Sequence, residues 1–299
     1  MAKARAIVKR RKAVRNIKKI TKTMQMIATA KFQKSLKRAV ATKPYSRKVR
    51  ELVAELAQSV GEVSHPLLRR PGVGDSTNTI ALVVITSNRG LAGAYNGSVL
   101  RAAGHFLREQ EAAGKKIDLY VVGKKGISYF NFQRRPIVQR FDIGDAPKFD
   151  DVEKIADQFI GQFIAGKYDA VWVAYMNFVS AGSQKAEVTA LLPLAGVEAA
   201  KPISPGAEGS ENLAIYDFYP DPKTLLDELL PQTVKTGLFQ FFLDATTSEH
   251  VARMISMKSA TDNADKMVKS LTMQYNRARQ SQITTELSEI MGGVEAMKG

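Results

Sequence analysis

The sequence predicts an α/β sheet domain inserted between two long helices, and the helices are expected to pair as an antiparallel coiled coil. Residues 1–60 and residues 213–299 both carry apolar side chains at three- and four-residue steps, as one face of a helix does. The stretch between them alternates short apolar runs with helical patterns. Two apolar stripes at opposite ends of one chain can be buried by packing against each other. If the domain between them brings the chain back to the first helix, the two helices run antiparallel.

The first predicted helix covers residues 1–60. Pro44 lies inside it and is expected to kink the helix or to cost it one turn. Gly61 and Pro66 are expected to end it. At about 1.5 Å per residue, such a helix would be roughly 85 Å long. The residues expected on its apolar face are Ile7, Val14, Ile17, Ile20, Met24, Ile27, Ala28, Phe32, Leu36, Ala39, Val40, Val49, Leu52, Val53, Leu56 and Val60.

The middle of the chain is expected to form the sheet domain, at residues 79–200, between a linker at 61–78 and a second linker at 201–212. Both linkers are rich in Pro, Gly and polar residues. Apolar runs of strand length and the helical patterns between them are typical of a doubly wound, Rossmann-like sheet with helices on both faces. The expected strands are 80–86, 117–122, 137–141, 168–176 and possibly 187–192, and the expected longer helices are 97–111 and 152–164.

The last predicted helix covers residues 213–299 and has the more regular stripe. Asp221 and Pro222 suit its first turn. The spacing is close to a heptad, but Ala, Met, Thr and Gln stand on the stripe as often as Leu, which predicts a narrow and imperfect zipper. The stripe is Val251, Met254, Ile255, Lys258, Thr261, Ala264, Met267, Val268, Leu271, Tyr275, Ala278, Gln282, Ile283, Leu287, Ile290, Met291 and Val294.

The chain is strongly basic, and its charge is concentrated near the start. The formal net charge is +15, and the first 50 residues hold most of the excess. A basic segment of this kind attracts a polyanion, which can be nucleic acid, anionic lipid or an acidic protein surface. An apolar stripe runs through the same block, so the helix must also pack against something. An acidic protein partner therefore fits best, with nucleic acid and a merely solvated face as alternatives.

The sequence carries no pattern that predicts catalysis, a cofactor or a metal. There are no cysteines, and the three histidines have no ligand spacing. No P-loop and no Gly-x-Gly-x-x-Gly follows a predicted strand. The run 89–93 (RGLAG) stands where a dinucleotide site would begin, but its spacing predicts a structural turn. A nucleotide-dependent enzyme on the sheet and a nucleic-acid-binding basic coiled coil remain as alternative functions.

Three runs together resemble the gamma subunit of rotary, F-type ATP synthases of the bacterial type. They are IKKITKTMQMIA at residues 17–28, SNRGLAGAYN at residues 87–96 and YNRARQSQITTELSEI at residues 275–290. The last contains the Ile-Thr-x-Glu-x-x-Glu pattern that marks the C-terminal signature of this family. The likeness covers nearly the whole chain in order.

The resemblance implies a central-stalk rotor that performs no bond chemistry and holds no cofactor. The helix pair would turn inside a ring of alpha and beta subunits, with the sheet domain against the epsilon subunit and the membrane c ring. No specific nucleic acid and no membrane insertion are implied, and the protein would be peripheral on the cytoplasmic face of the plasma membrane. The residues expected to contact the ring are Lys9, Arg10, Arg11, Lys12, Lys18, Lys19, Lys22, Met24, Arg279, Gln280, Thr284, Glu286, Met291 and Val294.

Overall fold

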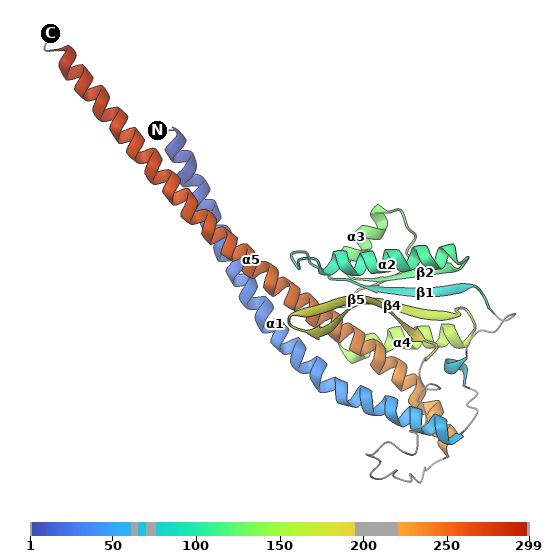
Figure 1. The fold of residues 1–299 in the computed structure, drawn as a ribbon. Helices are drawn as coiled ribbons and strands as arrows, with labels where there is room; N and C mark the ends of the chain where they lie inside the picture. Colours follow the sequence, from blue (N-terminus) through green and yellow to red (C-terminus); the bar gives the residue numbers. More distant parts are fainter. Residues whose placement is uncertain (1, 61–64, 70–75, 195–220, 298–299) are drawn as a thin grey trace, which may run out of the picture. The chain divides into compact units, whose positions relative to one another are not determined.

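A computed structural model describes residues 2–60, 65–69, 76–194 and 221–297. The predicted linker at 201–212 lies outside them, as does most of the one at 61–78. Two long helices stand at the ends of the chain, α1 (Ala2–Val60) and α5 (Pro222–Ala296) (Figure 1). Helix α1 continues without a break through Pro44. The chain divides into two units, residues 1–30 with 253–299 and residues 31–252.

The unit of residues 31–252 contains a five-stranded sheet in the order β3-β2-β1-β4-β5. Strands β1 to β4 are parallel, and β5 runs antiparallel to β4. The strands are β1 (Thr79–Ile85), β2 (Lys116–Val122), β3 (Gln139–Phe141), β4 (Ala170–Ser180) and β5 (Ser183–Leu192). The helices between them are α2 (Tyr95–Ala112), α3 (Lys124–Phe132) and α4 (Phe149–Ile164), and a 3₁₀ turn η1 covers Pro66–Leu68.

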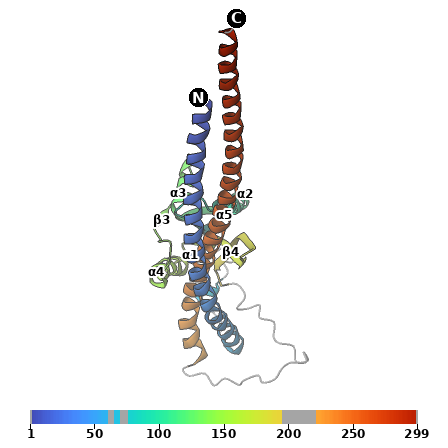
Figure 2. The same ribbon diagram turned by 90° about the vertical axis from the view of Figure 1, so that its left-hand side faces the viewer.

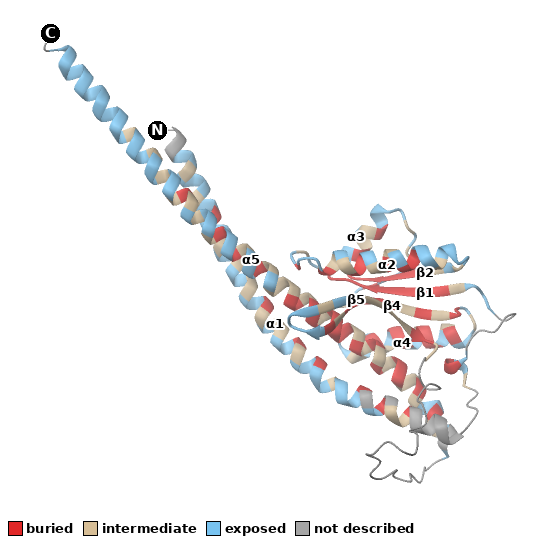
Figure 3. Cartoon of the chain, in the orientation of Figure 1, coloured by how far each residue is buried: buried red, intermediate tan, exposed pale blue. Residues whose placement is uncertain are grey.

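The central strand β1 is buried on both faces, as its continuous apolar run predicts. Ile80, Leu82 and Val84 pack with the layer that contains α2 and α3. The alternate residues pack with the layer that contains α4 and parts of α1 and α5. Figure 1 shows α2 and α4 on opposite sides of the sheet, and Figure 3 shows the buried residues concentrated between these layers. The predicted doubly wound arrangement is thus present.

Three of the expected strands differ from the structure by two or more residues at one end or both. The strand expected at 168–176 begins at Ala170 and continues to Ser180, because β5 returns beside it in a hairpin whose last paired residues are Ser180 and Ser183. The strand expected at 187–192 accordingly begins at Ser183. The third strand covers only Gln139–Phe141.

Candidate functional site

In the unit of residues 1–30 with 253–299, the first part of α1 and the last part of α5 lie side by side and antiparallel (Figures 1 and 2). On each helix, a set of buried and half-buried residues recurs at alternating steps of three and four, the 3.5-residue period that favours a left-handed supercoil. We call these residues the seam. On α1 they are Ile7, Arg11, Val14, Lys18, Thr21, Gln25 and Ala28, and on α5 they are Met257, Thr261, Ala264, Val268, Leu271, Tyr275, Ala278 and Gln282.

The apolar part of the seam is small. Its one cluster consists of Val14, Ala264 and Leu271, which are buried, and Ile7 and Val268 pack partly buried against them. Ala28 and Met257 are also buried, nearer the other end of the seam. Burying a Val or Leu side chain stabilises by about 1.5–3 kcal/mol. Because few such side chains are present, packing alone gives the pair only modest stability, and polar contacts across the seam contribute to its register.

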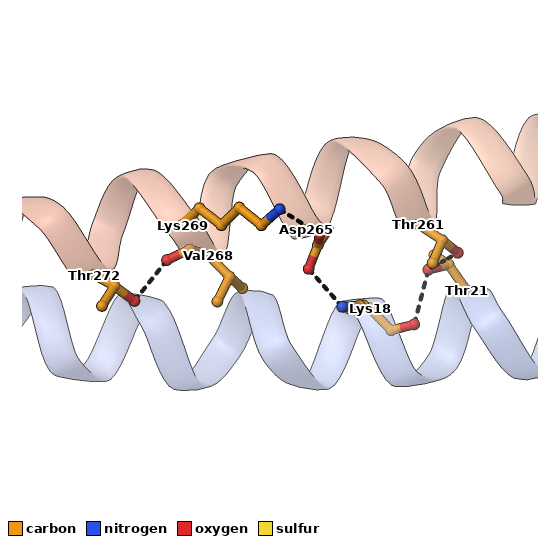
Figure 4. Close-up of polar contacts among 7 residues, drawn as sticks. All are labelled: Lys18, Thr21, Thr261, Asp265, Val268, Lys269 and Thr272. Carbon is orange, nitrogen blue, oxygen red and sulfur yellow. Dashed lines mark hydrogen bonds and ion pairs between the residues drawn. The ribbon is translucent and has the colours of Figure 1, made fainter.

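Polar side chains pair across the seam at three levels, of which Figure 4 shows the two at Thr21 and Lys18. The Thr261 hydroxyl donates to the Thr21 hydroxyl over 2.8 Å. Lys18 Nζ lies 2.6 Å from an Asp265 carboxylate oxygen. Further along, the Arg11 guanidinium lies 5.1 Å from the centre of the Tyr275 ring, within cation–π distance. As the residue number falls along α1 it rises along α5, so these pairs define an antiparallel register.

The seam differs from the predicted apolar face of α1. Ile17, Ile20 and Ile27, which were expected on the paired face, are 52%, 59% and 54% exposed. The prediction is wrong here because the structure follows the heptad, which places polar Arg11, Lys18 and similar residues in the seam. The three isoleucines instead form a second, unpaired apolar face on α1. Ile255 and Met267 of α5, 50% and 45% exposed, also lie off the seam.

The residues expected to contact a partner are placed in two ways. Arg11, Lys18 and Met24 are half-buried, and the charged groups of the first two have partners on α5. The others are exposed: Lys9, Arg10, Lys12, Lys19, Lys22, Arg279, Gln280, Thr284, Glu286, Met291 and Val294. The structure does not gather them into one patch. The basic residues lie along α1, whereas the C-terminal ones lie at or beyond the level where α1 begins.

The end of α5 continues as a single helix past the start of α1 (Figures 1 and 2). All of its residues from 283 to 297 are exposed, and Figure 3 colours this end of α5 pale blue. Ile283, Leu287, Ile290 and Val294 recur at steps of four, three and four, and they are 49%, 56%, 67% and 43% exposed. An apolar stripe on a helix without a neighbour is the pattern expected of a surface that another protein covers. We call residues 283–297 the tip.

Lys18 holds the pKa of Asp265 below its usual range by its hydrogen bond and its charge, and Lys269 adds a smaller effect. A carboxylate whose pKa is lowered by folding stabilises the fold above its unfolded pKa of about 4, and that contribution is lost as the pH falls through the lower folded value. In Asp265→Asn, the helix pair should therefore lose less stability than in the wild type as the pH falls below about 4.

The measurement is thermal unfolding of the full chain by circular dichroism between about pH 7 and pH 3. The matched control is Asp262→Asn, since Asp262 is exposed on the same helix. An acid-induced decrease in melting temperature that is equally steep in the wild type and in Asp265→Asn would contradict the assigned role of the Lys18 pair.

The loop after β1, where a dinucleotide site would begin, is held by its own hydrogen bonds. Ser87 N–H donates to the side-chain oxygen of Asn96, and the Asn88 amide donates to the Ile143 carbonyl. Leu91 and Gly93 have positive φ, 64° and 55°, as in a tight turn. Across the described residues, no group of three or more His, Asp or Glu side chains could hold a metal ion. Within the same residues, no helix is long and apolar enough to cross a bilayer.

Comparison with known proteins gives full-length matches. A family model described as ATP synthase matches residues 3–297. The chain is 43% identical to an ATP synthase gamma chain of Rhodopirellula baltica over 100% of both chains, and 39% identical to one of Leptospira biflexa over 99% of this chain and 100% of the relative. Two solved structures of the Euglena gracilis mitochondrial ATP synthase share the fold. A chain of its OSCP/F1/c-ring assembly matches with a TM-score of 0.65 and 20% identity, and the match covers 99% of this chain and 95% of that chain. A chain of its rotor matches with a TM-score of 0.63 and 19% identity, and the match covers 94% of this chain and 99% of that chain.

Proposed function

The chain belongs to the ATP synthase gamma chain family, and on that premise we propose that it is the central-stalk rotor subunit of a bacterial F-type ATP synthase. In this role it couples ion-driven rotation of the membrane c ring to conformational change in the catalytic ring of alpha and beta subunits. The observation that carries the proposal is the antiparallel helix pair, since its seam is closed and its outer faces are basic and apolar.

The helix pair has the properties of a driven shaft. Two helices joined along a common seam resist twisting better than a single helix, because each carries side chains that interlock with the other. Exposed Lys9, Arg10 and Lys12 attract acidic loops at a range that needs no fixed alignment of side chains. Such attraction persists while the neighbouring loops change during rotation.

The tip and the exposed isoleucines of α1 supply apolar contacts to the same ring. Met291 is 64% exposed and adapts its shape easily, which suits a surface that slides. Ile17, Ile20 and Ile27 extend the apolar surface along α1 among the basic residues. We assign these three isoleucines to the ring contact together with the residues that the sequence indicates.

The chain itself performs no bond chemistry and carries no cofactor in this proposal. The sheet domain is the part that meets the epsilon subunit and the c ring, so the protein is peripheral at the cytoplasmic face of the plasma membrane. The proposal of no bond chemistry is supported by the loop after β1, where a nucleotide site would begin. Polar groups of this loop form hydrogen bonds within the protein, such as Ser87 with Asn96 and Asn88 with Ile143.

Replacing Arg279 with Ala should loosen coupling in the assembled complex. Arg279 is exposed on α5 near the level where α1 begins, and its guanidinium can form charge-assisted hydrogen bonds with a ring loop. Losing such a bond costs about 1.5–3 kcal/mol, so we expect ATP-driven proton pumping to fall several-fold relative to ATP hydrolysis. Nucleotide affinity of the ring should not change.

The measurement compares pumping with hydrolysis in membrane vesicles that contain the reconstituted complex. Arg277→Ala is the control, because Arg277 is also exposed on α5 but two residues away, on a different side of the helix. Loss of ATP binding by the whole complex in Arg279→Ala would contradict the role assigned to this residue.

Co-expression with the alpha and beta subunits tests the proposal as a whole. One copy of this chain should purify with each ring, and the ring should hydrolyse ATP with a rotation that stops when the chain is cross-linked to it. Tight stoichiometric binding of ATP by the isolated chain would favour an enzyme instead. Retention on DNA with a sequence preference would favour a nucleic-acid-binding protein.

A further inference from the structure

A large cavity lies within the unit of residues 31–252. It has a volume of about 1200 Å³ and is lined by α1, by the hairpin of β4 and β5, and by the first half of α5. Ligand pockets typically have volumes of about 300–1,000 Å³, so the space is sufficient for a small organic molecule. Its lining includes Ser46, Tyr175, Glu187, Gly237, Gln240 and Asp244.

Two residues that line the cavity each carry a buried side-chain atom that has no hydrogen-bond partner among the described residues. The atoms are the Ser46 hydroxyl and the Gln240 side-chain oxygen, on residues that are 3% and 6% exposed. A buried polar atom without a partner costs about 1–3 kcal/mol. Both atoms are themselves buried, so a rotation of the side chain is needed to bring either of them to a ligand in the cavity, where the Gln240 oxygen would accept a hydrogen bond from a donor.

The cavity is acidic, in contrast to the chain as a whole. One lysine, Lys43, lines it together with three carboxylic acids, Glu51, Glu187 and Asp244. Asp244 is 5% exposed, and one of its oxygens accepts a hydrogen bond from the Gln240 amide over 3.1 Å. Glu187 accepts one from the Tyr175 hydroxyl over 3.0 Å. Glu51 is paired with Lys48 over 3.8 Å, so the excess of carboxylates over cations lies at Glu187 and Asp244. These two carboxylates, beside the Gln240 amide oxygen, favour a positively charged donor.

The pKa of Asp244 supports this reading. Burial raises it to about 6, and the charge of Glu187 adds to the rise, while Lys43 and the Gln240 hydrogen bond oppose it. At pH 8 the group is therefore a buried carboxylate with incomplete charge compensation. A cation beside it would stabilise that carboxylate.

The remaining wall is suited to an apolar body. The rings of Tyr175 and Phe241 lie 4.4 Å apart between centres. Gly237 stands inside α5, where glycine costs roughly 1 kcal/mol relative to alanine. A Cβ on Gly237 would meet nothing within 4 Å, so this glycine leaves the space beside it open.

We propose that this cavity is a binding site for an organic cation, with an ammonium or guanidinium head at Asp244 and Gln240 and an apolar body against Tyr175 and Phe241. The ammonium supplies donors to the carboxylate and to the unpaired amide oxygen. None of the residues that line the cavity belongs to the seam or the tip, and the proposal does not depend on the rotor assignment.

The test uses the full-length chain and 2-phenylethylammonium as the probe, with neutral 2-phenylethanol as its matched control. Calorimetric titration at pH 8 should show one saturable site that binds the amine at least tenfold more tightly than the alcohol, a difference of about 1.4 kcal/mol. Asp244→Asn should weaken amine binding about tenfold or more. Asp262→Asn, an exposed acid outside the cavity, should leave it unchanged.

A second variant tests the location independently of charge. Gly237→Leu places a side chain in the open space and should abolish binding, whereas Gly161→Leu, at another helical glycine with nothing within 4 Å, should not. Circular dichroism checks that both variants fold.

The pH dependence gives a third outcome. Lowering the pH from about 8 to 5 should weaken amine binding in the wild type as Asp244 is protonated. In Asp244→Asn the affinity should change less, since the groups that remain are Lys43, Glu51, Tyr175 and Glu187. Equal affinity for amine and alcohol, absence of saturable amine binding, or binding that survives both Asp244→Asn and Gly237→Leu would overturn the proposal.

Discussion

Replacing Gly123 with Ala should lower the free energy of unfolding of the sheet unit by about 3 kcal/mol or more. Gly123 has a φ of 91°, and a Cβ there would lie 2.2 Å from the Thr86 carbonyl oxygen. Thr86 cannot move aside easily. Its amide and its hydroxyl both donate to the Val122 carbonyl, and the hydroxyl accepts from Gly126 N–H. A positive φ costs about 1–2 kcal/mol, and overpacking typically costs 1–3 kcal/mol more.

Substitutions of two other glycines distinguish the cost of the positive φ from the cost of the steric clash, as measured by urea unfolding of the full chain. Gly166 has a φ of 72° with nothing within 4 Å of its Cβ, so Gly166→Ala should show only the backbone cost of about 1–2 kcal/mol. Gly161 lies inside α4 with open space, and Gly161→Ala should stabilise by up to about 1 kcal/mol. If Gly123→Ala costs no more than Gly166→Ala, the clash with Thr86 does not limit this position.

The sheet is predictable from the sequence because its central strands are buried on both faces. Residues 80–85 read as one apolar run, and all six are buried. The direction and start of the last strand are not predictable in this way. Residues 183–190 of β5 are exposed or half-buried, so their run is not apolar, and the pairing of Ser183 with Ser180 shows only in the structure.

The helix pair is predictable as an element but not in its contacts. An apolar pattern places Ile17 and Ile20 on the paired face, whereas the seam contains Arg11 and Lys18. Long basic side chains enter such a seam because a partner such as Asp265 stands opposite, and that partner is about 250 residues away in sequence. The cavity cannot be predicted from the sequence for the same reason, since its walls come from three distant parts of the chain.

Replacing Leu271 with Asp should separate the helix pair at its centre and abolish coupling. Leu271 is 5% exposed and packs in the small cluster with Val14 and Ala264. The change removes about 1.5–3 kcal/mol of apolar burial and places a carboxylate in a seam that has few apolar contacts to offset it. ATP-driven proton pumping by the complex should therefore fall more than tenfold. Unfolding of the sheet unit should remain as in the wild type, because Leu271 contributes nothing to its core.

Met273→Asp is the matched control, since Met273 is 59% exposed two residues further along the same helix. It introduces the same charge into α5 without entering the seam, so pumping should change less than twofold. Pumping and hydrolysis are measured together in vesicles, and unfolding is measured on the isolated chain. If Leu271→Asp pumps as well as Met273→Asp, the seam does not transmit torque. Packing of the two helices along the seam would then not be required for the rotor function of this chain.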